Sequence, residues 1–183
     1  MSPFEADYEP SPWEPIASEV ERYERSNGSE PSELVGDEWI VLWTLGARSA
    51  KVRKTPLVRT ADEEGCCAVI GSMGGAPTAP QWVHNVRANP IARLQDGEVL
   101  RDYGATRIGR RVAGEIVTAA PPHTAITWGG AAYRRTSYDV REAFAEEKAQ
   151  WWERATRVWP AYDDYQAATT RVIPLFVLEP AER

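Results

Sequence analysis

Four cationic side chains crowd into one short stretch of the chain: Arg48, Lys51, Arg53 and Lys54. Such a cluster suits a ligand rich in phosphate or carboxylate groups, which arginine can engage through two parallel hydrogen bonds. On a strand, side chains alternate between faces, so Lys51 and Arg53 would share one face and Lys54 would lie on the other. Lysines that guard an exposed edge strand are the alternative interpretation.

A second candidate site is the Ser-Met-Gly-Gly turn at residues 72–75. We expect a strand to end just before it, at Ile70, and a short helix to open near Pro80. Glycine lacks a Cβ, so backbone or a ligand can approach it closely. Loop amides ahead of a helix can receive an anionic or polarised group. An ordinary strand-to-helix connection is the alternative interpretation.

The usual catalytic motifs are absent from this sequence. It has no Gly-x-Ser-x-Gly nucleophile elbow, no Gly-x-Gly-x-x-Gly dinucleotide motif after a strand and no phosphate-binding P-loop. Cys66 and Cys67 are adjacent, so they should face opposite sides of a strand and form neither a disulfide nor a shared metal site. His84 and His123 have no Cys or His at ligand spacing, and we predict no metal. An enzyme of this kind would take its reactivity from a bound organic cofactor.

Length and charge narrow the class of protein. A chain of 183 residues fits one domain with a proper core. The net charge of −6 argues against a general nucleic-acid binder, which would show a basic face. No apolar run approaches membrane-spanning length, and the acidic, proline-rich start is unlike a signal peptide. We therefore expect a cytoplasmic protein that binds no nucleic acid.

The N-terminal region should consist of a flexible acidic arm over residues 1–10 and a helix. Ser11 as N-cap and Pro12 at the first helical position mark the helix start, and Asn27-Gly28 marks its end. An apolar stripe follows it at helical spacing: Trp13, Ile16, Val20 and Tyr23. The stripe packs on its own domain in one interpretation, and on a partner or a membrane surface in the other.

Strands are expected at residues 39–43, 51–60, 66–70 and 172–178, with a hairpin turn at Asp96-Gly97. Proline donates no ladder hydrogen bond. The prolines at positions 56 and 174 therefore place their strands at an edge or a bulge. Hairpin-linked strands with helices between them favour an α+β fold with an antiparallel barrel or sheet.

Helical pattern resumes at about Val140 and is broken at Pro160, and a second short helix is expected over residues 162–170. The segment 109–138 shows no clear periodicity apart from a strand at 115–118. Such a segment is typically a lid, an insertion or poorly ordered.

Motifs in one fixed order cover nearly the whole chain except about 107–140. They read YEPSPWE (8–14), RKTPL (53–57), SxGGAP (72–77), PxWxHN (80–85), ANP (88–90), LQDG (94–97), DY (102–103), EKAxWWER (147–154), YxxY (162–165) and IPxFVLEP (173–180). Together they resemble the deazaflavin-dependent nitroreductase family of actinobacteria, which includes F420H2-dependent quinone reductases and uses coenzyme F420.

The resemblance implies a split β-barrel of the FMN-binding type, antiparallel, with an N-terminal helix and helices inserted before the last strand. It divides the chain into an arm and amphipathic helix at 1–36 and a deazaflavin-binding domain at 37–183. Within that domain, about 107–140 is an atypical insertion or lid. It also implies a monomer or a homodimer. The implied location is the cytoplasm or the periphery of the inner face of the cell membrane.

The resemblance also implies the site. In the family, cations and amides hold the cofactor's phosphate and glutamate tail, and here they correspond to Ala47, Arg48, Ser49, Arg53, Lys54, Thr55, Pro56, Leu57 and Val58. The loop that lines the deazaflavin corresponds to Ile70, Gly71, Ser72 and Met73. The other side is closed by Gln81, Trp82, Val83, His84 and Asn85, with Trp82 against the cofactor. Tyr165 matches a cofactor-contacting tyrosine and Tyr162 a tyrosine on the substrate side.

The implied reaction is hydride transfer from reduced deazaflavin to a quinone, a nitroaromatic or an activated enone. The protein would hold the acceptor at near-attack distance. Ser72 is the candidate donor to developing negative charge, and Tyr162 or Tyr165 would orient the acceptor or relay a proton. An FMN-dependent reductase on the same barrel and a non-catalytic F420-binding carrier are the alternatives.

Three features depart from the family pattern. The usual Gly-Arg-Lys-Ser-Gly turn reads Gly-Ala-Arg-Ser-Ala at residues 46–50, which predicts weaker binding of the tail. Met73 stands where the family often has Lys or Leu. The third departure is the extra segment at about 109–138.

Overall fold

The structure is a computed structural model that describes residues 2–103, 105–112, 115–118, 125–128, 131–135 and 139–179. For residues 105–139 and 141 it describes the backbone alone. Three antiparallel sheets and four α-helices make up this part of the chain. The expected α+β class with antiparallel sheets is thereby confirmed.

The first sheet holds four strands in the order β2 (Val52–Val58), β1 (Trp39–Leu45), β5 (Ala92–Asp96) and β6 (Val99–Tyr103). Strand β2 lies at the edge, as Pro56 predicts, because a proline there leaves no ladder bond unmade. The predicted Asp-Gly hairpin joins β5 to β6, and Gly97 has a φ of 61°.

The second sheet has the order β11 (Asp139–Glu142), β12 (Leu175–Glu179), β4 (Cys67–Ile70) and β3 (Thr60–Ala61). The prediction that the last strand lies at an edge or a bulge is wrong, since β12 pairs on both sides. The proline at position 174 precedes the strand, so its missing N–H falls outside the ladder.

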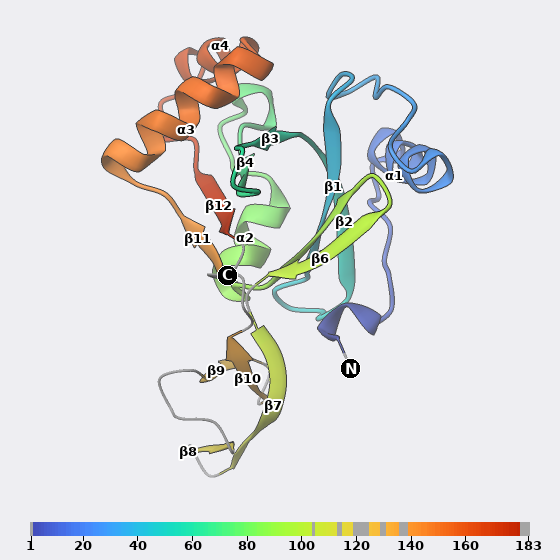
Figure 1. Cartoon of the computed structure of the whole chain (residues 1–183), viewed down its shortest axis with the longest axis vertical. Helices are drawn as coiled ribbons and strands as arrows, with labels where there is room; N and C mark the ends of the chain where they lie inside the picture. The colour runs from blue at the N-terminus through green and yellow to red at the C-terminus, as the bar shows by residue number, and fades with distance from the viewer. Residues whose placement is uncertain are drawn as a thin grey trace.

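The third sheet stands apart from the other two and shares no strand with them (Figure 1). Its order is β8 (Glu115–Thr118), β7 (Ala105–Val112), β10 (Ala131–Arg135) and β9 (Ala125–Trp128). The strand expected at 115–118 is confirmed. The Pro-Pro and Gly-Gly pairs of this segment lie outside the described residues, and an insertion or lid role for it stays a prediction.

Helix α1 (Glu14–Ser26) begins two residues later than the expected capping residues indicate, with Trp13 as N-cap and no side-chain cap bond. The Ser11 hydroxyl instead accepts from the Trp13 amide at 3.2 Å. The expected end is confirmed, because Asn27 adopts a left-handed φ of 51° and its N–H donates to the Tyr23 carbonyl. Such a left-handed residue is a common way to end a helix.

The apolar stripe of α1 packs on the first sheet. Val20 and Tyr23 are 1% exposed and form a cluster with Trp39 and Val41 of β1. The Tyr23 and Trp39 rings meet edge to face, with centroids 4.5 Å apart. The interpretation that the stripe packs on its own domain is confirmed for these residues, whereas Trp13 is 59% exposed.

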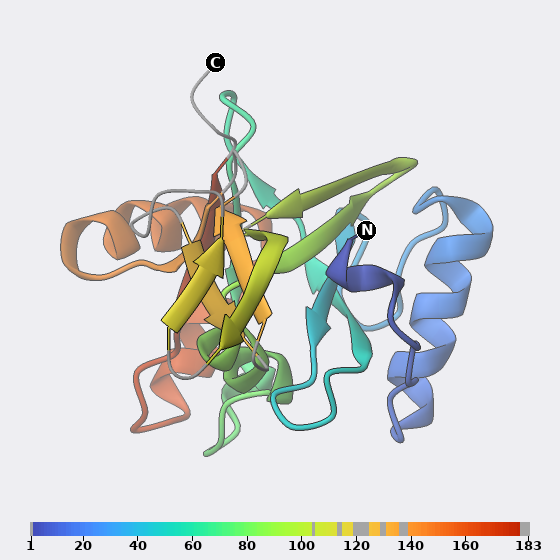
Figure 2. The same ribbon diagram turned by 90° about the horizontal axis from the view of Figure 1, so that it is seen from below.

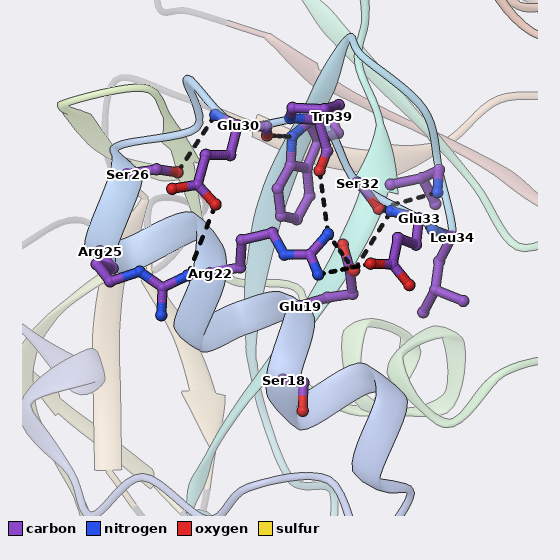
Figure 3. Close-up of polar contacts among 12 residues, drawn as sticks. Ser18, Glu19, Arg22, Arg25, Ser26, Glu30, Ser32, Glu33, Leu34 and Trp39 are labelled. Carbon is purple, nitrogen blue, oxygen red and sulfur yellow. Dashed lines mark hydrogen bonds and ion pairs between the residues drawn. The ribbon is translucent and has the colours of Figure 1, made fainter.

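Polar contacts hold α1 to the loop that precedes β1 (Figure 3). Arg22 Nη2 lies 2.8 Å from Glu33 Oε1, and the Glu33 amide donates to Glu19 Oε1 at 3.3 Å. Trp39 Nε1 donates to the Glu30 carbonyl at 2.9 Å. Glu19 is 4% exposed, and its Oε1 also lies 3.4 Å from Arg22 Nη1, whereas its Oε2 has no partner among the described residues.

The N-terminal arm, expected to be flexible, meets the free edge of β2 at Val52 through an isolated parallel bridge with Tyr8. The Glu9 amide donates to the Val52 carbonyl, and the Val52 amide donates to the Asp7 carbonyl, each at 2.9 Å. Phe4, in the short 3-10 helix η1 (Pro3–Glu5), is 4% exposed. Covering an edge strand removes a surface that would otherwise pair with another chain.

Helix α2 (Gln81–Ala88) packs between the first two sheets and closes the main core. That core gathers buried residues from α2, from β1 and from β4 and β12 of the second sheet. Helices α1 and α3 lie on opposite sides of the molecule in both views (Figures 1 and 2).

The C-terminal helices differ from the expectation at their start. Residue Val140 lies in β11 and not in a helix, and α3 (Ala145–Val158) begins only after that strand. A strand of four residues is too short for its sequence pattern to be told from a helical turn. The predicted break is confirmed, because Pro160 caps α4 (Ala161–Ala167). No described helix is both long and apolar enough to cross a membrane.

Candidate functional site

The loop after β4 packs tightly against α2. The Gly71 amide donates to the Pro174 carbonyl at 2.9 Å. A Cβ at Gly71 would lie 2.7 Å from Val83 Cγ2 and 2.9 Å from Pro174 Cγ. Only glycine allows this approach, so the loop is held against both the helix and the residue that precedes β12.

Three successive residues of the turn have left-handed backbone. The φ angles are 48° at Met73, 63° at Gly74 and 80° at Gly75. A Cβ at Gly75 would lie 2.8 Å from the Tyr165 carbonyl oxygen, so this glycine lets the turn touch α4. The fold thus brings the glycine turn and the helix of Tyr165 together, as the predicted site requires.

Met73 combines two uncommon features. A non-glycine residue with positive φ is strained, and such strain gathers at functional sites. Its side chain is also 57% exposed, although it is apolar. The short 3-10 helix η2 (Met73–Gly75) therefore presents a methionine to the surface beside the turn.

Ser72 lies at the start of this turn and is 9% exposed. Its carbonyl accepts from the Gly75 amide at 3.0 Å. Its hydroxyl has no hydrogen-bond partner in the part of the chain that the structure describes, and the same is true of the Ser72 and Met73 amides. The turn therefore carries free donors next to α4.

Sequence reasoning missed Arg171, which fixes this turn from the other side. Its Nη2 donates to the carbonyls of Gly71 at 3.1 Å and of Ser72 at 2.6 Å, and its Nε donates to the carbonyl of Ala76 at 2.7 Å. No local sequence pattern indicates this contact, because Arg171 follows α4 and lies 100 residues from Gly71.

The α2 residues predicted to close the site are partly buried in the core and partly exposed. Trp82 and Val83 are buried, at 3% and 0% exposure, and Trp82 meets Phe176 edge to face with ring centroids 5.6 Å apart. Gln81 and His84 are exposed. Trp82 thus packs within the core, and a contact between it and a cofactor stays a prediction.

Asn85 links α2 to the turn between β1 and β2. Its Nδ2 donates to Thr44 Oγ1 at 3.1 Å, and its Oδ1 accepts from the Ala47 amide at 3.1 Å. Asn85 is 2% exposed, so both bonds are shielded from water. Its side chain positions the turn in this structure.

The turn itself is exposed. Its residues Ala47, Arg48, Ser49 and Ala50 all face solvent. The Ser49 hydroxyl accepts from the Lys51 amide at 3.4 Å. Arg48 makes no hydrogen bond or ion pair with any described residue, so its charge is free to bind an anion.

The two faces of β2 have different partners. Arg53 pairs across the ladder with Thr44, the partner of Asn85, so this face looks toward α2. By strand alternation Thr55 and Leu57 share that face, and Leu57 packs on the main core. Pro56 and Val58 are buried on the other face.

Lys54 lies on that other face, as strand alternation predicts. Its Nζ sits 4.0 Å from the Trp43 ring centroid and 4.4 Å from the Tyr8 ring centroid, and it pairs with Glu24 of α1. Its side chain is 9% exposed. The lysine is thus held in a cation–π cage and not beside Arg53.

Arg53 and Lys51 already hold a carboxylate. Arg53 Nη2 pairs with Glu9 Oε2, and its Nη1 donates to the Glu9 and Pro10 carbonyls at 3.3 Å each. Lys51 Nζ lies 4.0 Å from the same Glu9 oxygen. This observation shows that the cations converge on one anionic group, which is the chemistry that an anionic tail would need.

The two predicted tyrosines of α4 lie together. The Tyr162 and Tyr165 rings meet edge to face with centroids 6.2 Å apart, and Tyr165 Oη accepts from Trp159 Nε1 at 3.4 Å. Tyr162 is 4% exposed, and burial raises the pKa of its phenol well above the usual value. Tyr162 is therefore a neutral hydroxyl at any pH near neutrality.

The cysteines take no part in this site. Cys66 and Cys67 are free, as expected, and burial raises the pKa of their thiols to about 11 and about 12. Within the described ranges, no three His, Cys, Asp or Glu side chains gather where they could hold a metal ion.

Comparison with known proteins supplies the family. The model of the F420H(2)-dependent quinone reductase family matches residues 16–115 and 117–180. An F420H(2)-dependent quinone reductase of Mycobacterium tuberculosis is 31% identical over 141 residues, which cover 76% of this chain and 71% of the relative. A putative F420H(2)-dependent quinone reductase of Mycobacterium bovis matches to the same extent.

Two solved structures are similar as well. The structure of an F420-H2 dependent reductase superimposes with a TM-score of 0.54 at 30% identity, covering 77% of this chain and 93% of that one. A structure described as a domain-swapped dimer gives a TM-score of 0.56 at 29% identity, covering 87% and 96%. The resemblance inferred from the motifs is confirmed: this chain belongs to the F420H(2)-dependent quinone reductase family of oxidoreductases, whose reduced cofactor is coenzyme F420.

Proposed function

We propose that this protein transfers a hydride from reduced coenzyme F420 to a quinone, and that nitroaromatics and activated enones serve as further acceptors. Membership in the family supports the reductase class. The observation that carries the proposal is the left-handed turn of Met73, Gly74 and Gly75, packed on the helix of Tyr165 with its donors free.

The residues present fit the cofactor chemically. Arg53 and Lys51 converge on the Glu9 carboxylate, so the same cations suit the phosphate and glutamate carboxylates of an F420 tail. Arg48, with no partner among the described residues, adds a third charge on the exposed turn. The glycine turn suits the close approach of a deazaflavin ring, and its free amides suit negative charge that develops beside that ring. Gln81, His84 and the α2-facing residue Thr55 would line the space between them.

When bound, the reduced deazaflavin supplies the hydride. The protein's part is to hold an acceptor at near-attack distance, exclude water and stabilise negative charge where it develops. The Ser72 hydroxyl donates a hydrogen bond to the reduced carbonyl oxygen of the acceptor. Tyr165 would orient the acceptor, and the neutral Tyr162 hydroxyl is the second candidate for that orienting role.

The same proposal covers the finer architecture. We infer that the first two sheets are the halves of a split barrel, because Arg59 alone separates β2 from β3 and so joins one sheet to the other. A homodimer is the proposed assembly, supported by the similar structure described as a domain-swapped dimer. The exposed Trp13 is the part of the N-terminal stripe that remains available for a membrane surface.

The test is direct. Purified protein is mixed with reduced F420 and menadione or a nitroaromatic, and reoxidation is followed at the deazaflavin absorbance band. The proposal is supported if the wild type turns over and if Ser72→Ala lowers its turnover rate about tenfold or more. Tight binding without turnover indicates a carrier, and flavin retained on purification indicates an FMN enzyme. No binding of F420 refutes the proposal.

A further inference from the structure

The Arg171 guanidinium spans three backbone carbonyls of the glycine turn. It reaches the oxygens of Gly71, Ser72 and Ala76 at 3.1, 2.6 and 2.7 Å. These oxygens bracket the turn at its first, second and last residues. One side chain therefore fixes the orientation of the peptide units on both sides of Met73.

This arginine has no carboxylate partner among the described residues. Burial lowers the pKa of its guanidinium, yet arginine stays protonated in proteins. Its Nη1 is buried and also lacks a partner within the described ranges. The side chain as a whole is only partly buried, and a hydrophobic residue in its place would leave the three carbonyls without these hydrogen bonds. The task of the guanidinium therefore lies in the turn.

Peptide geometry defines that task. No described peptide bond is cis, so each N–H points opposite to the carbonyl of the preceding residue. With the carbonyls of Gly71 and Ser72 directed at Arg171, the amides of Ser72 and Met73 must point away from it. Ser72 is right-handed (φ −71°, ψ −45°) and Met73 is left-handed, a pairing that makes successive amides converge on an anion.

We propose that Arg171 is a positioning residue that aims the amides of Ser72 and Met73 and the Ser72 hydroxyl at the negative charge of the reaction. The identity of the bound group rests on the proposed function. The clamp itself does not, because every contact that defines it lies within the protein. The guanidinium also places a full positive charge behind the peptide dipoles that it orients.

A double-mutant cycle tests the action of Arg171 through Ser72. Arg171→Gln is expected to lower the hydride-transfer rate with saturating menadione about tenfold or more, while the affinity for F420 changes less. In a Ser72→Ala background the same substitution should cost less than in the wild type, because the hydroxyl that Arg171 positions is already gone and only the two amides remain to be misaligned. Two independent, multiplicative losses would overturn the proposal.

The lysine variant separates geometry from charge. Lysine carries the same charge but lacks the planar fork that reaches three carbonyls. Arg171→Lys should therefore remain within about threefold of the glutamine variant. Full recovery by lysine would overturn the positioning role. Arg157→Gln is the matched control, since Arg157 is an exposed arginine whose partner among the described residues is Glu153 of its own helix. The hydride-transfer rate of this variant should equal that of the wild type.

Hydrogen exchange provides a readout without cofactor. The Gly75 and Ala76 amides donate to the Ser72 and Met73 carbonyls at 3.0 and 3.1 Å, so they report the turn. Arg171→Lys is the variant to use, because it is the milder change and serves even if the glutamine variant does not fold. It should speed the exchange of these two amides about tenfold or more, while exchange in α1 is unaffected. Unchanged exchange would overturn the clamp. Faster exchange in a protein that does not oxidise F420H2 would support the clamp and refute the proposed function.

Discussion

Two turns frame the candidate site, and they are held in different ways. The turn at 71–76 is fixed by the Arg171 guanidinium and by glycines whose Cβ positions are filled by Val83, Pro174 and Tyr165. The turn at 46–50 is exposed from Ala47 onward, and a bond from the Ala47 amide to Asn85 joins it to α2 within the described part of the chain. Backbone geometry thus builds the first turn, whereas the second turn offers a ligand the charge of an exposed side chain.

The difference has a chemical reason. A reacting ring must be held within a fraction of an ångström, which favours rigid elements and oriented dipoles. An anionic tail needs only attraction, which exposed cations such as Arg48 supply over a longer range.

The largest effect is expected from Gly75→Ala. A Cβ there would meet the Tyr165 carbonyl oxygen at 2.8 Å with φ at 80°, whereas Gly74 has a φ of 63° and open space. Gly74→Ala should cost about 1 kcal/mol of unfolding free energy for backbone strain alone. Gly75→Ala should cost about 2–4 kcal/mol. Urea unfolding measures both, and equal losses would show that the turn is not packed on α4.

Asn85→Ala tests how weakly the other turn is attached. It removes a buried acceptor for the Ala47 amide and a donor to Thr44, so a loss of about 1–3 kcal/mol is expected. His84→Ala, an exposed neighbour on the same helix, should change the unfolding free energy by less than about 0.5 kcal/mol. A similar small value for both variants would mean that the turn is held by contacts other than this one.

Ala47→Arg restores the cation that the family pattern has at this position. Affinity for F420 should rise about threefold to tenfold, the effect of one partly exposed ion pair, and the gain should shrink at high salt. A tail-free deazaflavin serves as the control ligand and should bind with unchanged affinity. If wild type and variant bind F420 equally, the altered turn does not weaken tail binding.

Glu9→Gln frees Arg53 and Lys51 from the arm carboxylate. We expect F420 to bind about twofold to fivefold more tightly, because removing the negative charge leaves two cations for the tail. Glu5→Gln, an exposed change on the same arm, is the control. Titration by fluorescence measures the affinity, and weaker binding by the Glu9 variant would indicate that the arm helps to hold the tail.

The smallest effect concerns the neutral Tyr162 beside the rigid turn. Burial raises its folded-state pKa above the unfolded value, so its contribution to stability is complete below about pH 10 and is lost as pH rises beyond it. Between neutral pH and pH 10.5 the unfolding free energy should therefore fall less in Tyr162→Phe than in the wild type, by about 1 kcal/mol or less. A loss of stability between pH 7 and 9 that depends on Tyr162 would contradict a buried neutral phenol.

Several features followed from local sequence alone. Pro56 identified an edge strand, Asp96-Gly97 a hairpin, Asn27 a helix end and Pro160 a break, because each acts through its own backbone. The ordered motifs also identified the family. Other local expectations were wrong, among them the helix start at Ser11, the helix at Val140 and the edge position of the last strand. Pairing with neighbouring strands, which local pattern does not show, decided the last two.

The residues that shape the site depended on tertiary structure. No pattern around Arg171 indicates that it meets Gly71, which lies 100 residues away, or that Glu9 meets Arg53. Nor does the sequence show that Lys54 turns into an aromatic cage. Motifs specify which chemical groups are present, because residue type is local. Which group a cation faces is set by pairing between distant strands and helices, and that pairing exists only once the chain has folded.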